Sequence, residues 1–94
     1  MSYSLVFLEE ALKEWGSLDN TLKQQLKKKL AERLENPRVE SSRLSGMKDC
    51  YKIKLRQAGY RLVYEVREDV VVVAVIAIGK RERNSVYKLA AKRI

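Results

Sequence analysis

The sequence contains no histidine and a single cysteine, Cys50. Without histidine the chain lacks the commonest metal ligand and the usual acid–base residue, and a Ser-His-type triad is excluded. One cysteine cannot form an internal disulfide, which fits a reducing cytoplasm. Because no histidine is available to activate its thiol, we expect Cys50 to be a buried or edge residue without a catalytic role.

Long apolar runs and nucleotide-binding loops are also missing. No apolar run reaches the roughly 18 residues that span a bilayer. The first apolar run is followed closely by acids and preceded by no basic segment, so it does not resemble a signal peptide. No glycine-rich loop follows a predicted strand, and the acidic residues are scattered. We therefore expect a cytoplasmic protein that uses no metal and no cofactor.

What the chain has in excess is positive charge. It carries 20 Lys and Arg residues against 12 Asp and Glu residues, a formal net charge of +8. Such an excess favours a polyanionic partner, with nucleic acid first and an acidic protein second, over a role in solubility alone. The cations concentrate in residues 23–29, 43–61 and 80–93.

The 94 residues, 46% of them hydrophobic, are enough for one small domain spanning 1–94. Hydrophobic periodicity and turn residues predict the elements in turn. They are a strand over 3–7, a helix over 9–16, a helix from Asp19 or Asn20 to Glu35, a loop over 39–48, strands over 50–56, 60–66 and 70–79, and a C-terminal helix capped by Asn84 or Ser85.

This β-α-α-β-β-β-α order predicts an α+β fold with a mainly antiparallel sheet. The second helix carries a stripe of leucines, Leu22, Leu26, Leu30 and Leu34, which is typical of a core-facing surface. The run of apolar residues over 70–79 predicts a central strand buried on both faces. We expect the first two helices to cover the apolar face of the sheet and to leave one open, basic face.

The basic face originates in the segment CYKIKLRQAGYRLVYEV, over 50–66. Apolar and basic side chains alternate there, and a strand sends successive side chains to opposite faces. The apolar set is Tyr51, Ile53 and Leu55, and the basic set is Lys52, Lys54 and Arg56. A two-residue loop at Gln57 and Ala58 would place Arg61 opposite Lys54, and a three-residue loop with a bulge at Gly59 is the alternative.

Such a cluster suits phosphoryl chemistry on RNA. Cleavage by the ribose 2′-OH needs a base, charge stabilisation at the phosphate and an acid at the leaving oxygen. Arginine matches phosphate oxygens, and crowded cations lower a lysine pKa toward the range of a general base. Arg81 leaves the end of the central strand, and Tyr87 follows on the last helix. From the residues alone, a phosphate-binding face without catalysis and a ribonuclease both stay open.

Three segments, CYKIKLRQAGYRLVYEV, GKRERNSVY and LKKKLAERLENPR, resemble the RelE family of bacterial toxins, within the RelE/ParE superfamily. The resemblance covers essentially the whole chain. It implies a ribosome-dependent endoribonuclease that cuts mRNA in the ribosomal A site by 2′-OH attack and leaves a 2′,3′-cyclic phosphate. It also implies a RelB-like antitoxin, which together with the toxin represses their own operon by binding operator DNA.

Position by position, the resemblance assigns five residues to catalysis. Lys54 matches the general base and Lys52 a lysine that stabilises the transition state. Arg61 matches the arginine that steadies the phosphate, and Arg81 the one proposed as general acid. Tyr87 matches the tyrosine that stacks on a base and orients the substrate.

Further cations are candidates for binding substrate or ribosomal RNA. They are Lys23, Lys27 and Lys28 on the second helix, and Arg43, Lys80 and Arg83. Near relatives carry a basic residue beside the loop glycine, where this chain has Ser45 before Gly46, and Arg43 would partly replace it. Two alternative functions stay open. One is a ParE-like toxin that binds DNA gyrase without cleavage, and the other is a non-catalytic RNA- or protein-binding module.

Overall fold

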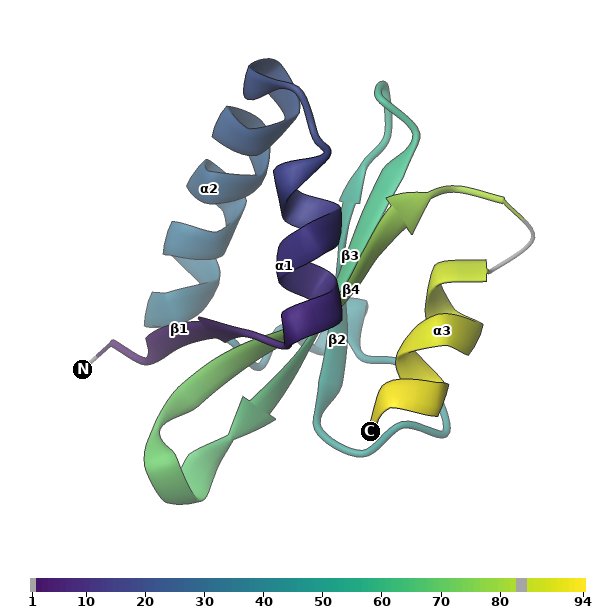
Figure 1. Ribbon diagram of the computed structural model, residues 1–94. Coiled ribbons are helices and arrows are strands. Elements are labelled where there is room, and N and C mark those ends of the chain that lie inside the picture. The colour runs from purple at the N-terminus through teal and green to yellow at the C-terminus, as the bar shows by residue number, and fades with distance from the viewer. Residues whose placement is uncertain (1, 83–84) are drawn as a thin grey trace.

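A computed structural model describes residues 2–82 and 85–94 of the chain as a four-stranded sheet with helices on both faces (Figure 1). The elements are β1 Ser4–Phe7, α1 Glu9–Gly16, α2 Asn20–Glu35, β2 Cys50–Leu55, β3 Tyr60–Arg67, β4 Val72–Lys80 and α3 Ser85–Arg93, with short 3₁₀ turns at Glu40–Ser42 and Glu68–Val70. The strand order is β1-β4-β3-β2, and only the pair β1–β4 is parallel. The predicted α+β fold and order of elements are confirmed.

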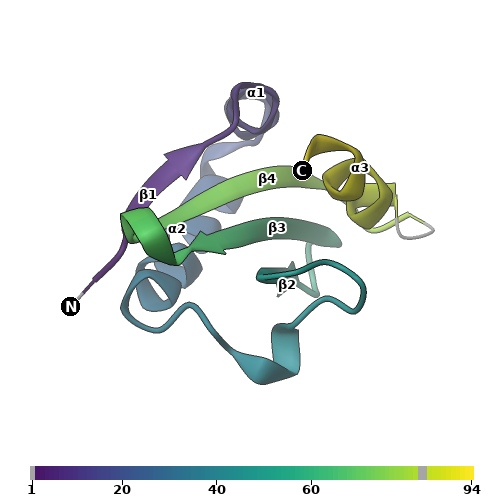
Figure 2. The same ribbon diagram turned by 90° about the horizontal axis from the view of Figure 1, so that it is seen from below.

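The central strand β4 is apolar on both faces, as predicted, and its residues 73–78 are all buried. Helices α1 and α2 cover one face, and α3 covers the other (Figure 2). Leu26 and Leu30 of the leucine stripe are buried in the first core, with Leu22 and Leu34 packed at its margin. No helix within the described ranges is long and apolar enough to cross a membrane.

The expected open face is smaller than predicted, because α3 packs on it. Val86 and Ala90 of α3 form a second core with Val63 of β3 and with Ala74 and Ile76 of β4. Helix α3 is the next element after β4 in the chain, and its apolar side is buried against this face. Apart from Cys50, which belongs to this second core, β2 and the adjoining end of β3 stay uncovered on this face, and they carry Lys52, Lys54 and Arg61.

The β2–β3 hairpin has the predicted pairing with a different loop. Lys54 lies opposite Arg61, as expected, and Leu55 lies opposite Tyr60. Four residues, 56–59, connect the strands, so both expected loop lengths are wrong. The N–H of Gly59 donates to the Leu55 carbonyl at 2.9 Å, and Gly59 adopts a φ of 70°, which glycine reaches without steric cost.

Side chains complete the edge of β4 where β1 ends. The pairing with β1 stops at Val75, and beyond it Glu14 Oε1 accepts from the N–H of Ile78 at 3.0 Å. Arg93 donates to the Ile76 carbonyl at 2.8 Å, and to Glu14 Oε1 and Oε2 at 2.9 Å each. This two-residue clamp satisfies the free backbone groups and fixes the C-terminal end of α3 against α1.

We expect Glu14→Ala to lower the free energy of unfolding by about 3 kcal/mol, because it leaves the Ile78 N–H without its partner and the Arg93 charge with only the exposed Glu10. The Arg93 side chain is only 10% exposed. The matched control is Glu10→Ala, since Glu10 also pairs with Arg93, at 3.4 Å, but is 67% exposed. Its cost should stay below about 1 kcal/mol. Urea denaturation measures both, and equal losses would contradict the clamp.

Candidate active site

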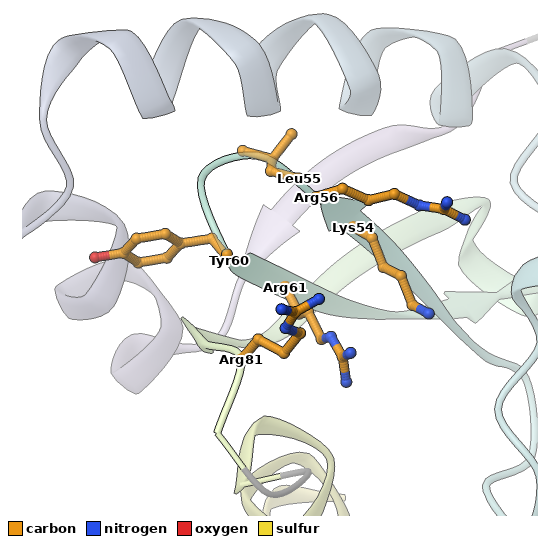
Figure 3. Close-up of a pocket in the computed structure, with 7 residues that line it drawn as sticks. Lys54, Leu55, Arg56, Tyr60, Arg61 and Arg81 are labelled. Carbon is orange, nitrogen blue, oxygen red and sulfur yellow. The ribbon is translucent and has the colours of Figure 1, made fainter.

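Four cations converge on the uncovered part of the sheet. Lys54 and Arg61 face each other across the hairpin, and the N–H of Arg81 donates to the Gly59 carbonyl at 2.7 Å, which ties the chain after β4 to the hairpin. With Arg56 they line a hollow of about 300 Å³ that has no acidic residue in its wall. Figure 3 shows Lys54 and Arg61 on the same side of the hairpin and Arg81 reaching toward Arg61 from the segment after β4, while Leu55 and Tyr60 point away.

The cluster changes the acid–base behaviour of Lys54. Its amine is exposed, and its pKa is lowered from the ordinary lysine value. The largest cause is the charge of Lys52, followed by partial desolvation and then by the charges of Arg61, Arg56 and Arg81. Like charges disfavour the protonated amine, so more of Lys54 is neutral at a given pH than of an isolated lysine. This is the property that a general base requires.

Arg61 and Tyr87 form the boundary between the cluster and α3. The Arg61 guanidinium lies over the Tyr87 ring, 5.3 Å from its centroid. Tyr87 is half-buried at the margin of the second core. Among the described residues, neither the buried Nε of Arg61 nor the buried hydroxyl of Tyr87 has a hydrogen-bond partner. The stacking holds Arg61 against α3 through a cation–π contact.

Arg33, which the sequence analysis did not single out, supports the strand that carries Lys52. Its guanidinium donates to the Lys52 carbonyl at 3.1 Å, to the Tyr64 hydroxyl at 2.9 Å and to Ser42 Oγ at 3.3 Å. The sequence did contain a signal for this role, because Arg33 follows the buried Leu30 by three residues and so lies on the apolar side of α2. Arg56 was also missed as a site residue, although it continues the alternation of Lys52 and Lys54.

The other predicted cations are not gathered at this hollow. Arg43 pairs with Glu40 at 3.2 Å and lies over the Tyr51 ring, 5.7 Å from its centroid. Lys80 lies opposite Tyr60 in the sheet register, so it shares the sheet face of α1 and α2 and not that of Arg61. Lys28 lines a neighbouring hollow and Lys27 a hollow on the opposite flank of α2. Arg83 and the proposed cap Asn84 lie outside the described residues.

Cys50 takes no part in the cluster. It is fully buried, as expected, and burial together with Glu65 and Asp49 raises the pKa of its thiol to about 11. A thiol with so high a pKa is a poor nucleophile. Within residues 2–82 and 85–94, no three His, Cys, Asp or Glu side chains are arranged to hold a metal ion.

Comparison with known proteins is consistent across sequence and structure. The family model of the ParE toxin of type II toxin–antitoxin systems (parDE) matches residues 5–85. The chain is 62% identical to the mRNA interferase toxin RelE of Escherichia coli K12 over 94 residues, which cover 100% of this chain and 99% of that protein. It is 52% identical, with the same coverage, to a putative RelE-like toxin protein of Escherichia coli.

Solved structures agree. A mutant of Escherichia coli RelE in the free state superposes with a TM-score of 0.92 at 60% identity, covering 100% of this chain and 99% of that chain. The same mutant in complex with a peptide of the antitoxin RelB superposes with a TM-score of 0.84 at 60% identity and the same coverage. The chain therefore belongs to the RelE toxins, within the ParE toxin family of type II toxin–antitoxin systems.

Proposed function

We propose that this toxin is an mRNA interferase, an endoribonuclease that cuts mRNA in the ribosomal A site and so inhibits translation. The observation that carries the proposal is the hollow in which Lys54, Arg61 and Arg81 meet without an acidic residue, and in which the pKa of Lys54 is lowered. The activity named for the 62% identical relative supports it.

In the proposed reaction, side-chain cations supply the charge stabilisation that many nucleases take from metal ions. The neutral amine of Lys54 accepts the proton of the ribose 2′-OH, and the 2′-oxygen forms a bond to phosphorus. Lys52 and Arg61 stabilise the additional negative charge on the phosphoryl oxygens. The bond from phosphorus to the 5′-oxygen breaks, and the products are a 2′,3′-cyclic phosphate and a 5′-hydroxyl.

Arg81 is assigned to the leaving 5′-oxygen, where a hydrogen bond and a proton are needed. An arginine is a poor acid by its reference pKa. Tyr87 is assigned to stacking on a substrate base. Its contact with Arg61 would link the position of that base to the position of the phosphate.

The proposed partners follow from the family. A RelB-like antitoxin would neutralise the toxin, and the toxin–antitoxin complex would bind operator DNA and repress its own operon. Cleavage would depend on the ribosome, whose A site presents the mRNA, and would take place in the cytoplasm. Solved complexes of the 60–61% identical Escherichia coli RelE with RelB support the antitoxin assignment.

Binding of DNA gyrase without cleavage, the alternative on the same scaffold, is less well supported. The family model is named for ParE, but the full-length relative at 62% identity is an mRNA interferase. A gyrase-binding protein also has no need for a lysine whose pKa is lowered by four neighbouring cations.

We expect Lys54→Ala and Arg81→Ala each to reduce mRNA cleavage by about 100-fold or more, since each removes a group assigned to proton transfer. Primer extension on a translated mRNA, after controlled expression, maps the cuts. Lys48→Ala removes an exposed charge just before β2 and should cut like the wild-type protein.

Two results would contradict the proposal. If both variants cut at the wild-type rate, the catalytic assignment is wrong. If the wild-type protein arrests growth while mRNA stays intact, the nuclease function is wrong, and inhibition of DNA supercoiling should then be measured.

We also expect Lys52→Gln to raise the pKa of Lys54 toward the ordinary lysine value, because the charge of Lys52 is the largest cause of the lowering. Since the neutral amine is the active form, the rising limb of the pH–rate profile should move to higher pH by the same amount. NMR titration of the Lys54 amine measures the shift directly, without any assay of cleavage. The control Lys48→Gln should leave the titration unchanged, and an unchanged titration in Lys52→Gln would contradict the electrostatic explanation.

A further inference from the structure

A second hollow adjoins the first on the other side of the hairpin tip. It has a volume of about 490 Å³, within the range of about 300–1,000 Å³ that is usual for ligand sites. It lies between α2 and the hairpin. Its polar wall consists of four cations and two amides, Lys28, Lys29, Lys54, Arg56, Gln25 and Gln57.

The cations of the second hollow lack counter-charges. No acidic residue lines it, and none of its four cations takes part in an ion pair between described residues. Elsewhere on the chain, Arg38, Arg43 and Arg93 each pair with a carboxylate. Cations that are held close together without acids repel each other, so the hollow is favourable mainly when an anion occupies it.

The two hollows share one wall, made of Lys54, Leu55 and Arg56. An RNA strand whose reacting phosphate lay at Lys54 and Arg61 would therefore place an adjacent phosphate in the second hollow. Grooves for single-stranded nucleic acid follow the backbone in this way, with successive cations along its path.

The lysines of α2 lie on two different flanks of the helix, so this hollow is not part of one continuous basic surface. Lys28 and Lys29 lie on the flank of α2 that faces the hairpin. Lys27 lies on the opposite flank, where it borders an apolar hollow with Leu5 and Trp15. Of the predicted ribosomal RNA contacts, Lys27 and Lys28 therefore lie on different flanks of α2, and Lys28 lies with Lys29 on the flank that faces the hairpin.

We propose that the second hollow is an additional mRNA subsite, in which Arg56, Lys28 and Lys29 bind a backbone phosphate that flanks the scissile one. This inference rests on the proposed nuclease function. It assigns Arg56 to both phosphates, because Arg56 borders both hollows, and it moves Lys28 from a ribosomal RNA contact to a substrate contact.

Uncleavable 2′-O-methyl oligonucleotides of three, five and seven residues test the subsite by fluorescence anisotropy at low salt. The affinity of the wild-type protein should rise with length. The double variant Lys28→Gln/Lys29→Gln should bind the shortest oligonucleotide like the wild-type protein and the longest about tenfold more weakly, with a salt slope smaller by about 1. The control Lys13→Gln/Lys48→Gln removes the same charge elsewhere and should bind all lengths like the wild-type protein.

Three outcomes would overturn the subsite. One is an equal loss of oligonucleotide affinity in the control variant, which would show that the effect comes from the net charge alone. Another is a wild-type affinity that does not rise with length. The third is weaker sedimentation of the Lys28→Gln/Lys29→Gln variant with mRNA-free ribosomes while oligonucleotide binding is unchanged, which would assign the hollow to ribosomal RNA. Failure of the nuclease function itself would appear separately, as uncut mRNA with the wild-type protein.

Discussion

The burial of β4 on both faces is the constraint on which the rest of the structure depends. A strand that is apolar on both sides needs a covering layer on each, and three α-helices among the described residues supply them. Helices α1 and α2 take one face, and the short α3 takes the other. Helix α3 packs on β4 and β3, and of β2 only Cys50 belongs to the core beneath it, so Lys52 and Lys54 are left uncovered on that side. The candidate active site is this remainder of the sheet.

The cation cluster is stable only because other interactions hold its parts. Lys54 and Arg61 are opposite each other in a sheet, an arrangement that costs stability by itself. The hairpin is held by the apolar residues that alternate with the cations, since Ile53 and Leu62 are buried beneath it. Arg33 supports the strand from α2, and the Glu14–Arg93 clamp fixes the helix that brings Tyr87 to Arg61. The repulsion at the site is therefore offset by packing and hydrogen bonds outside it.

Much of the fold could be predicted from the sequence, because each element carries its own local signal. The leucine stripe, the apolar run of β4 and the alternation in β2 predict which sides are buried. The cover by α3 could not be predicted from such signals, since it depends on where a helix packs and not on whether it forms. The pairing of Lys54 with Arg61 followed from strand alternation, whereas the four-residue loop depends on the conformation of Gly59. Arg33 was missed because its role depends on contacts between α2 and the hairpin strands. Arg56 was missed although it continues the alternation of Lys52 and Lys54.

The lowered pKa of Lys54 has a thermodynamic consequence for substrate binding. The same cations that disfavour a proton on Lys54 attract the phosphate, and a bound phosphate favours the protonated amine. Binding of RNA is therefore coupled to proton uptake, and the affinity falls as the pH rises through the pKa of Lys54. One phosphodiester carries one negative charge, and several cations surround it. The pKa of Lys54 therefore stays partly lowered when RNA is bound. As the pH rises, RNA affinity therefore falls while the fraction of neutral Lys54 increases. The number of cations around Lys54 sets the balance between these two effects.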